Sequence, residues 1–97
     1  MEIDFAQQVT APDDVLVRVL DGEAVILNLD SESYFGLDEV GTRMWTLLTE
    51  SASIQAAYDV LASEYEVEPA QLKTDLVDLI CQLQENGLVA VENGQAV

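Results

Sequence analysis

Apolar residues in the first half of the chain gather in short runs that are separated by polar turns. Two runs, Val15 to Leu20 and Ala24 to Leu29, are rich in β-branched residues and leucine and are joined by Asp21-Gly22-Glu23. This pattern is typical of a β-hairpin, because glycine accepts the positive φ of a tight turn. A second turn, Asp30 to Ser33, leads into Tyr34 to Leu37, whose aromatic and aliphatic residues favour a third strand. The sequence therefore predicts a three-stranded antiparallel meander.

The second half of the chain has the period of amphipathic helices. Asp38 is a good N-cap for a first helix, in which Met44 lies on the apolar stripe and is expected in the core. Ser53 is a good N-cap for a second helix. Pro69 suits the first turn of a third helix, and Asn86-Gly87 supplies its C-terminal stop. Three helices are therefore predicted after the strands.

The third helix has more apolar surface than a helix on the outside of a domain needs. Projected at about 100° per residue, its apolar positions cover about 160°, whereas a single packed face takes about 100°. We therefore expect this helix to meet apolar neighbours in two directions, with Asp75 and Gln82 just beyond the edge that Leu79 marks. The apolar positions are Leu72, Leu76, Val77, Leu79, Ile80 and Leu83.

These elements predict one domain with a flanking segment at each end. Residues 1–14 show little periodicity and are expected to form a flexible N-terminal arm, residues 15–91 the folded domain and residues 92–97 a tail. Leu88 to Val91 is expected to be a short strand or extended segment that closes the fold. A three-stranded antiparallel sheet followed by three helices is an α+β domain similar to a winged helix-turn-helix.

The charge of the chain argues against the usual partner of that fold. Its 97 residues include 19 acidic side chains against Arg18, Arg43 and Lys73, which gives a formal net charge of −16. Proteins bind nucleic acids and anionic membranes mainly through Lys and Arg, so we expect neither as a partner. No apolar run approaches the roughly 20 residues of a membrane span, and the N-terminus lacks a signal-sequence pattern, which predicts a cytoplasmic protein. The acidity serves solubility alone or also steers a basic ligand.

Residues that carry chemistry are few. The chain has no histidine and one cysteine, Cys81, so structural zinc and iron–sulfur sites lack their usual ligands. Cys81 is expected to be half-buried on a helix flank, with no histidine to activate it as a nucleophile. The acidic residues fit turns and helix caps, and no calcium-loop pattern is present. We therefore expect no cofactor, no metal and no catalytic role.

The segment from Asp30 to Trp45 is the most informative part of the chain, because a strand runs into a helix there with almost no loop. A short aromatic strand in this position is typical of a sheet edge, and an open edge accepts a peptide as an added strand. Side-chain alternation is expected to bury Phe35 and Leu37 and to turn Tyr34 outward. Gly36 fits either a β-bulge or the close approach of a ligand.

Two stretches of the chain carry a family resemblance: VLVRVLDGEAVILNLDSESYFGLDEVGTRMWTLL and ASEYEVEPAQLKTDLVDLICQLQENGLV. The resemblance rests on the order and spacing of its features along the chain. They are the aliphatic strand pair, the strand that runs into Asp38, Gly41 and Trp45, and the closing Gly87-Leu88. They resemble the coenzyme PQQ synthesis protein D-like family of precursor peptide recognition elements, and within it the discrete leader-binding proteins of lasso-peptide biosynthesis. The resemblance covers about residues 15–91.

The resemblance implies a noncatalytic protein that binds the leader region of a ribosomally synthesised precursor peptide. It implies delivery of that peptide to a separate leader peptidase or other tailoring enzyme. It also implies that the leader adds as a strand to the third strand, in the cleft between that strand and the third helix. The implied peptide-binding residues are Glu32, Ser33, Tyr34, Phe35, Gly36 and Leu37 on one wall and Leu72, Asp75, Leu76, Asp78 and Leu79 on the other.

The residue chemistry is compatible with this hypothesis and with others. Free backbone groups at the edge bind any backbone, the extra apolar arc accepts an aromatic or aliphatic side chain, and Glu32, Asp75 and Asp78 select Lys or Arg. The expected ligand is therefore extended, partly apolar and basic. One alternative is a generic protein–protein interaction adaptor that docks a folded partner, and another is a degenerate winged helix that only dimerises. The open edge also allows a homodimer that competes with the peptide.

Overall fold

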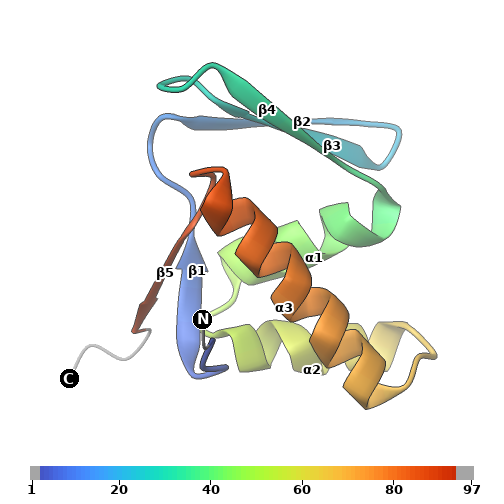
Figure 1. Ribbon diagram of the computed structural model, residues 1–97. Helices are drawn as coiled ribbons and strands as arrows, with labels where there is room; N and C mark the ends of the chain where they lie inside the picture. Colours follow the sequence, from blue (N-terminus) through green and yellow to red (C-terminus); the bar gives the residue numbers. More distant parts are fainter. Residues whose placement is uncertain (1–2, 94–97) are drawn as a thin grey trace.

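The computed structural model describes residues 3–93 and contains a three-stranded antiparallel sheet followed by three helices (Figure 1). This confirms the predicted α+β class. A further pair of strands joins the two ends of the described chain. Within the described residues, no helix has the length and apolar character needed to cross a membrane. The elements in chain order are β1 (Gln7–Thr10), β2 (Val15–Leu20), β3 (Glu23–Asn28), β4 (Ser33–Leu37), α1 (Glu39–Glu50), α2 (Ile54–Glu64), α3 (Pro69–Glu85) and β5 (Ala90–Asn93).

The main sheet has the strand order β2-β3-β4, so β3 is central and β2 and β4 are its two edges. Asp21 and Gly22 both have positive φ, 54° and 83°, which is the conformation of a tight two-residue hairpin turn. The turn from β3 to β4 is held by the Asn28 side chain, whose Oδ1 accepts hydrogen bonds from the N–H groups of Asp30 and Ser31. The predicted meander is confirmed.

The helices begin where the capping residues predict. The Asp38 carboxylate accepts a hydrogen bond from the Gly41 N–H at 2.8 Å, and the Ser53 hydroxyl accepts one from the Ala56 N–H at 3.1 Å. Gly87 follows the end of α3 with a φ of 70°, the left-handed conformation that stops helices. Because Asp38 directly follows β4 and caps α1, the two elements meet without a loop.

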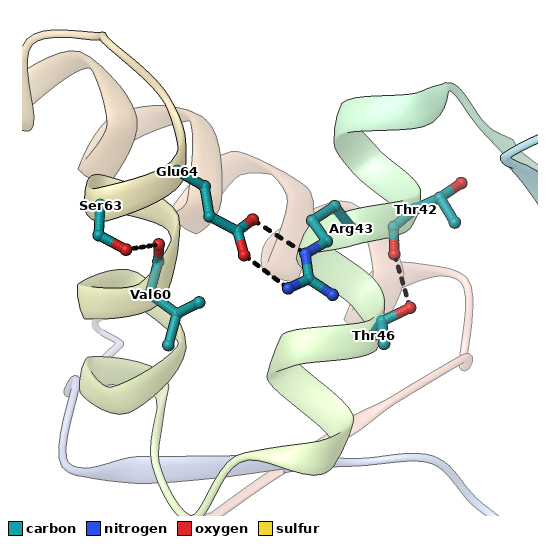
Figure 2. A network of polar contacts seen from close by, with 6 residues as sticks. All are labelled: Thr42, Arg43, Thr46, Val60, Ser63 and Glu64. Carbon is teal, nitrogen blue, oxygen red and sulfur yellow. Dashed lines mark hydrogen bonds and ion pairs between the residues drawn. The ribbon is translucent and has the colours of Figure 1, made fainter.

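Figure 2 shows the polar contact between α1 and α2. Arg43 donates from Nε and Nη2 to the two carboxylate oxygens of Glu64, at 2.9 and 2.6 Å. This bidentate hydrogen bonding lowers the pKa of the Glu64 carboxyl and raises the pKa of the Arg43 guanidinium. Both side chains are partly exposed to water, so the pair orients the two helices more than it stabilises the fold.

The flexible arm predicted for residues 1–14 is wrong for the residues that form β1. β1 pairs antiparallel with β5, from the far end of the chain, and Val9 in its middle is completely buried. Phe5 packs edge-on against Tyr58 of α2 with ring centroids 5.8 Å apart. A short polar strand gives no periodic signal of its own, and its partner lies about 80 residues away in sequence.

The predicted tail also differs from the structure, because Glu92 and Asn93 belong to β5. Leu88 and Val89, predicted as part of the closing strand, are buried and precede it. The remaining expectations for the ends of the chain, at residues 1–2 and 94–97, lie outside the described residues.

The core lies between the helices and the underside of the main sheet, and α3 passes through it. One face of α3 is buried in this core, and it is formed by Leu72, Leu76, Ile80 and Leu83. The Asn28 side-chain amide at the end of β3 donates to the Gly87 carbonyl at 2.9 Å and so ties the end of α3 to the sheet. As a result, the C-terminal half of α3 lies nearer the sheet than its N-terminal half (Figure 1).

Candidate functional site

The hydrogen bonding of β3 determines which backbone groups at the sheet edges are free. In an antiparallel strand, successive residues point their N–H and C=O groups alternately toward one neighbour and toward the other. The Leu29 N–H donates to the Asp14 carbonyl at 2.8 Å, so Leu29 points its backbone toward β2. Counting back by one-residue steps, Asn28 and Ile26 therefore point their backbone groups toward β4.

The same alternation sets the free edge of β4. Ile26 is paired with Phe35 in a register that continues without interruption from Ser33 to Leu37. Phe35 therefore points its backbone at β3, and the backbone N–H and C=O groups of Tyr34 and Gly36 point away from the sheet. No other described strand pairs with that side of β4. The edge thus presents unpaired donors and acceptors at two alternate residues.

An open groove of about 510 Å³ runs beside this edge. Its walls come from the end of β4, the first turns of α1 and the middle and C-terminal turns of α3. The lining residues are Phe35, Gly36, Leu37, Asp38, Val40, Gly41, Met44, Asp75, Leu79 and Gln82.

The side chains of β4 divide between the two faces of the sheet as predicted. Leu37 is buried and Phe35 is half-buried on the core side, whereas Tyr34 is 74% exposed on the outer side. The predicted burial of Phe35 and Leu37 is confirmed. Tyr34 does not line the groove, so its contribution to the edge is its backbone.

Gly36 lines the groove, and its position on the strand is on the same outer face as Tyr34. The one-to-one register of β3 and β4 excludes the β-bulge that was one of the two interpretations of this glycine. A Cβ atom built on Gly36 would meet no other atom within 4 Å. Packing within the chain therefore does not require glycine here, and the close approach of a ligand to Gly36 stays a prediction.

α3 presents three residues to the groove, Asp75, Leu79 and Gln82, which follow one another at helical spacing. The sequence identified this edge of the helix. The predicted site also contained Leu72 and Leu76, but these side chains are 4% and 0% exposed and lie in the core.

The remaining predicted residues lie outside the groove. Asp78 is exposed on α3 but does not line it. Glu32 is exposed in the turn before β4, where its φ is 60°, and Ser33 is half-buried at the start of the strand. The structure thus gathers Phe35, Gly36 and Leu37 with Asp75 and Leu79, and leaves the other predicted side chains apart.

Sequence reasoning missed the wall that α1 supplies. Val40 is 43% exposed and Met44, predicted as core, is 5% exposed, yet both line the groove. An added Cβ on Gly41 would come within 3.2 Å of the Leu37 side chain, so this glycine lets the helix start lie close to the end of β4. The signal available in the sequence was the absence of a loop at Asp38, which brings the first turn of α1 beside the strand.

The groove carries acidic charge and no cation among its lining residues. The Asp75 carboxylate accepts a hydrogen bond from the Gln71 side-chain amide at 2.8 Å, which leaves further acceptor positions for a ligand. One oxygen of Asp38 caps α1. The described residues contain no group of three or more side chains that could hold a metal ion. The charge that the lining residues bring to the groove is therefore acidic, from Asp38 and Asp75.

Comparison with protein families gives a match over residues 23–89 to the model described as coenzyme PQQ synthesis protein D (PqqD). The chain belongs to the PqqD family. The PqqD match begins with β3 and ends before β5, so it includes every residue that lines the groove. A comparison with curated proteins finds no match.

Two solved structures resemble this PqqD-family chain over nearly its whole length. The first, described as TbiB1 in complex with the TbiA(beta) leader peptide, is 34% identical, with a TM-score of 0.77 and coverage of 91% of this chain and 99% of that one. The second, described as lasso peptide synthetase B1 complexed with the leader peptide, is 26% identical. Its TM-score is 0.77, and the match covers 86% of this chain and 98% of that one.

Proposed function

We propose that this protein is a noncatalytic recognition element for the leader region of a ribosomally synthesised precursor peptide, namely that of a lasso peptide. The leader adds as an antiparallel strand to β4, and the protein delivers it to a separate maturation enzyme. The observation that carries the proposal is the open edge of β4, with unpaired backbone groups at Tyr34 and Gly36 beside a groove.

Strand addition accounts for the arrangement of the edge. A guest strand bonds to the backbone groups of Tyr34 and Gly36, and each such bond contributes a net ~0.5–1.5 kcal/mol. These bonds do not depend on the side chains of the guest. Every second guest side chain then points toward the groove, because alternation in the guest follows that of the sheet. A slip of one residue exchanges the two faces of the guest, so the groove also sets its register.

The groove supplies the sequence preference. Val40, Met44 and Leu79 form an apolar surface for an aliphatic or aromatic guest side chain. Asp75 lies on the same helical edge as Leu79 and favours a nearby Lys or Arg. With a net charge of −16, the whole protein also attracts a basic peptide at long range. The ligand is extended, partly apolar and basic.

The two similar structures support the class of ligand. Both are complexes with leader peptides, and in both cases almost all of the solved chain aligns with this one. The recognition part of the proposal therefore rests on proteins of the same size and fold. Delivery to a maturation enzyme is part of the same proposal, and it is supported by the lining of the groove, which includes neither histidine nor cysteine as a nucleophile or general base.

Titration calorimetry with the N-terminal segment of the precursor peptide encoded beside this protein tests the proposal through Gly36→Pro. The proline removes the outward N–H of Gly36 but no hydrogen bond to β3, and a Cβ atom at this position meets no atom within 4 Å outside the neighbouring residues. We expect at least ~10-fold weaker leader binding, because one guest carbonyl is left without a donor.

Val19→Pro is the matched control, because it places proline at an outward-facing position of the opposite edge strand. We expect this variant to bind the leader as the unmodified protein does. Equal losses in both variants would indicate a general effect of proline on the sheet. Unchanged binding by folded Gly36→Pro would contradict strand addition and favour the adaptor function, in which a folded partner docks without using the edge.

A further inference from the structure

The opposite edge of the sheet, β2, is more exposed and more apolar than β4. Leu16, Val17, Val19 and Leu20 are 46%, 38%, 55% and 76% exposed. Leu16 and Leu20 lie on the outer face of the sheet, and Val17 and Val19 lie on the side of the helices. α1 packs beneath β3 and β4 and leaves the valines of β2 accessible. The strand thus exposes apolar side chains on both of its faces.

The backbone of β2 is also unpaired on its outer side. Asp14 accepts its hydrogen bond from Leu29, so alternation points the backbone groups of Val15, Val17 and Val19 away from the sheet. The Val15 N–H is already engaged by the Pro12 carbonyl at 3.1 Å. Both backbone groups of Val17 and Val19 are left free by the described strands.

β2 has few of the features that usually protect an edge strand. Exposed edges are commonly interrupted by proline, lysine or a β-bulge, or are covered by a helix or loop. β2 contains no proline, its one charged residue is Arg18, and its register with β3 is one-to-one over the whole strand. A strand with five apolar residues out of six, no bulge and an unpaired outer side is a surface for pairing with another strand.

We propose that β2 pairs antiparallel with β2 of a second copy of this chain, forming a two-fold symmetric dimer with a continuous six-stranded sheet. An interface of this kind uses the same strand on both copies, so the strand must complement itself. Alternation requires outward-pointing residues to meet, and this limits the symmetric pairings to those centred on Leu16, Val17 or Arg18.

The pairing centred on Val17 fits best. Centring on Arg18 would set two guanidinium groups directly opposite one another, which is destabilising. Centring on Leu16 would place Val17 opposite Val15 of the second copy, whose backbone N–H already donates to Pro12 of its own chain. It would also leave the backbone groups of Val19 without a partner strand. With Val17 opposite its copy, Val19 also donates to Val15 of the second copy. Arg18 then lies opposite Leu16 of the second copy, with the oppositely charged Asp14 on one diagonal and the second Arg18 on the other, so the two guanidinium groups are farther apart than in the pairing centred on Arg18.

The net charge makes this dimer sensitive to salt. Each copy carries a formal charge of −16, so two copies repel one another at long range, and salt screens that repulsion. Dimerisation therefore strengthens as the salt concentration rises. Binding of a basic leader at β4 has the opposite dependence, because salt screens an attraction there. The dimer leaves β4 open, so each copy still binds one leader.

Analytical ultracentrifugation of the full chain, over a range of protein and salt concentrations, tests the dimer through Val17→Lys. This change places two like charges opposite one another at the two-fold axis, and we expect at least ~10-fold weaker dimerisation. Val67→Lys makes the same change in residue and net charge at a 48% exposed position outside the sheet, and it should dimerise as the unmodified protein does. A monomer under all conditions, or equal effects of both variants, would overturn the proposal.

A cysteine variant tests directly whether the two β2 strands meet at Val17. It also avoids the introduction of a charged lysine into the sheet. In a Cys81→Ser background, Val17→Cys brings two thiols together across the axis, at a Cα separation of about 5.5 Å that suits a disulfide. Mild oxidation should give a covalent dimer that still binds the leader, whereas Val67→Cys in the same background should not cross-link. If Val17→Cys does not cross-link, or if both positions cross-link equally, the inference is overturned, whatever the outcome of the leader-binding experiments.

Discussion

Two adjacent faces of α3 have different surroundings: one is buried in the core, and the other lines the groove. Leu76, Ile80 and Leu83 belong to the buried stripe, and the residues that precede them, Asp75, Leu79 and Gln82, line the groove. A step of one residue turns a helix by about 100°, so the two stripes lie on adjacent faces. If the groove binds the leader as proposed, one helix supports both the core and the binding site, and substitutions of neighbouring residues should separate effects on stability from effects on binding.

The largest effect is expected for Leu76→Ala, on the buried face. Leu76 is completely buried, and its truncation leaves a cavity that typically costs about 2–5 kcal/mol of the free energy of unfolding. Chemical denaturation measures this loss, with Leu79→Ala as the comparison on the groove face. We expect a clearly smaller loss for Leu79, which is only half-buried. Equal losses of unfolding free energy in the two variants would mean that Leu79 belongs to the core as much as Leu76 does, which would contradict the division of α3 into a buried face and a groove face.

Leu79→Ala should instead weaken leader binding while the protein stays folded. Leu79 supplies apolar surface to the groove, and we expect at least ~10-fold lower affinity by calorimetry, since contacts at a pocket centre commonly contribute more than 1 kcal/mol. Val77→Ala is the matched control, because Val77 is also a half-buried aliphatic residue of α3 but does not line the groove. If Val77→Ala weakens binding as much as Leu79→Ala, the loss comes from the helix as a whole and not from the groove.

Elements with local signals were predictable from the sequence. Asp38 and Ser53 cap helices through hydrogen bonds to N–H groups three residues later, so their role depends on a few neighbouring residues. The hairpin turn is equally local, since it depends on the φ values of Asp21 and Gly22. β1 was missed because its order comes from β5, and no local pattern records a partner at the other end of the chain.

The site was predictable only in part, because it depends on how α3 crosses the sheet. The wide apolar arc of α3 indicated two directions of contact, but nothing in the arc shows which part faces the core. Leu72 and Leu76, which the family resemblance implied for the groove, are buried, while Leu79 at the edge of the arc does line it. The wall from Val40 and Met44 depends on the angle at which α1 leaves β4, which composition and periodicity do not encode.

The smallest expected effect concerns the charge at the edge of the groove face. Asp75→Lys should weaken binding of a basic leader, and the loss should be greater at low salt than at high salt, since salt screens the interaction between the groove and the peptide. Asp78→Lys changes the same residue type on the same helix and alters the net charge equally, but Asp78 does not line the groove.

Calorimetry at two salt concentrations then separates two contributions to the loss of affinity. A loss shared by both variants reports long-range attraction by the acidic protein, and the additional loss in Asp75→Lys reports contact within the groove. Equal losses at both salt concentrations would restrict specificity to the apolar surface around Leu79 and to the backbone edge of β4.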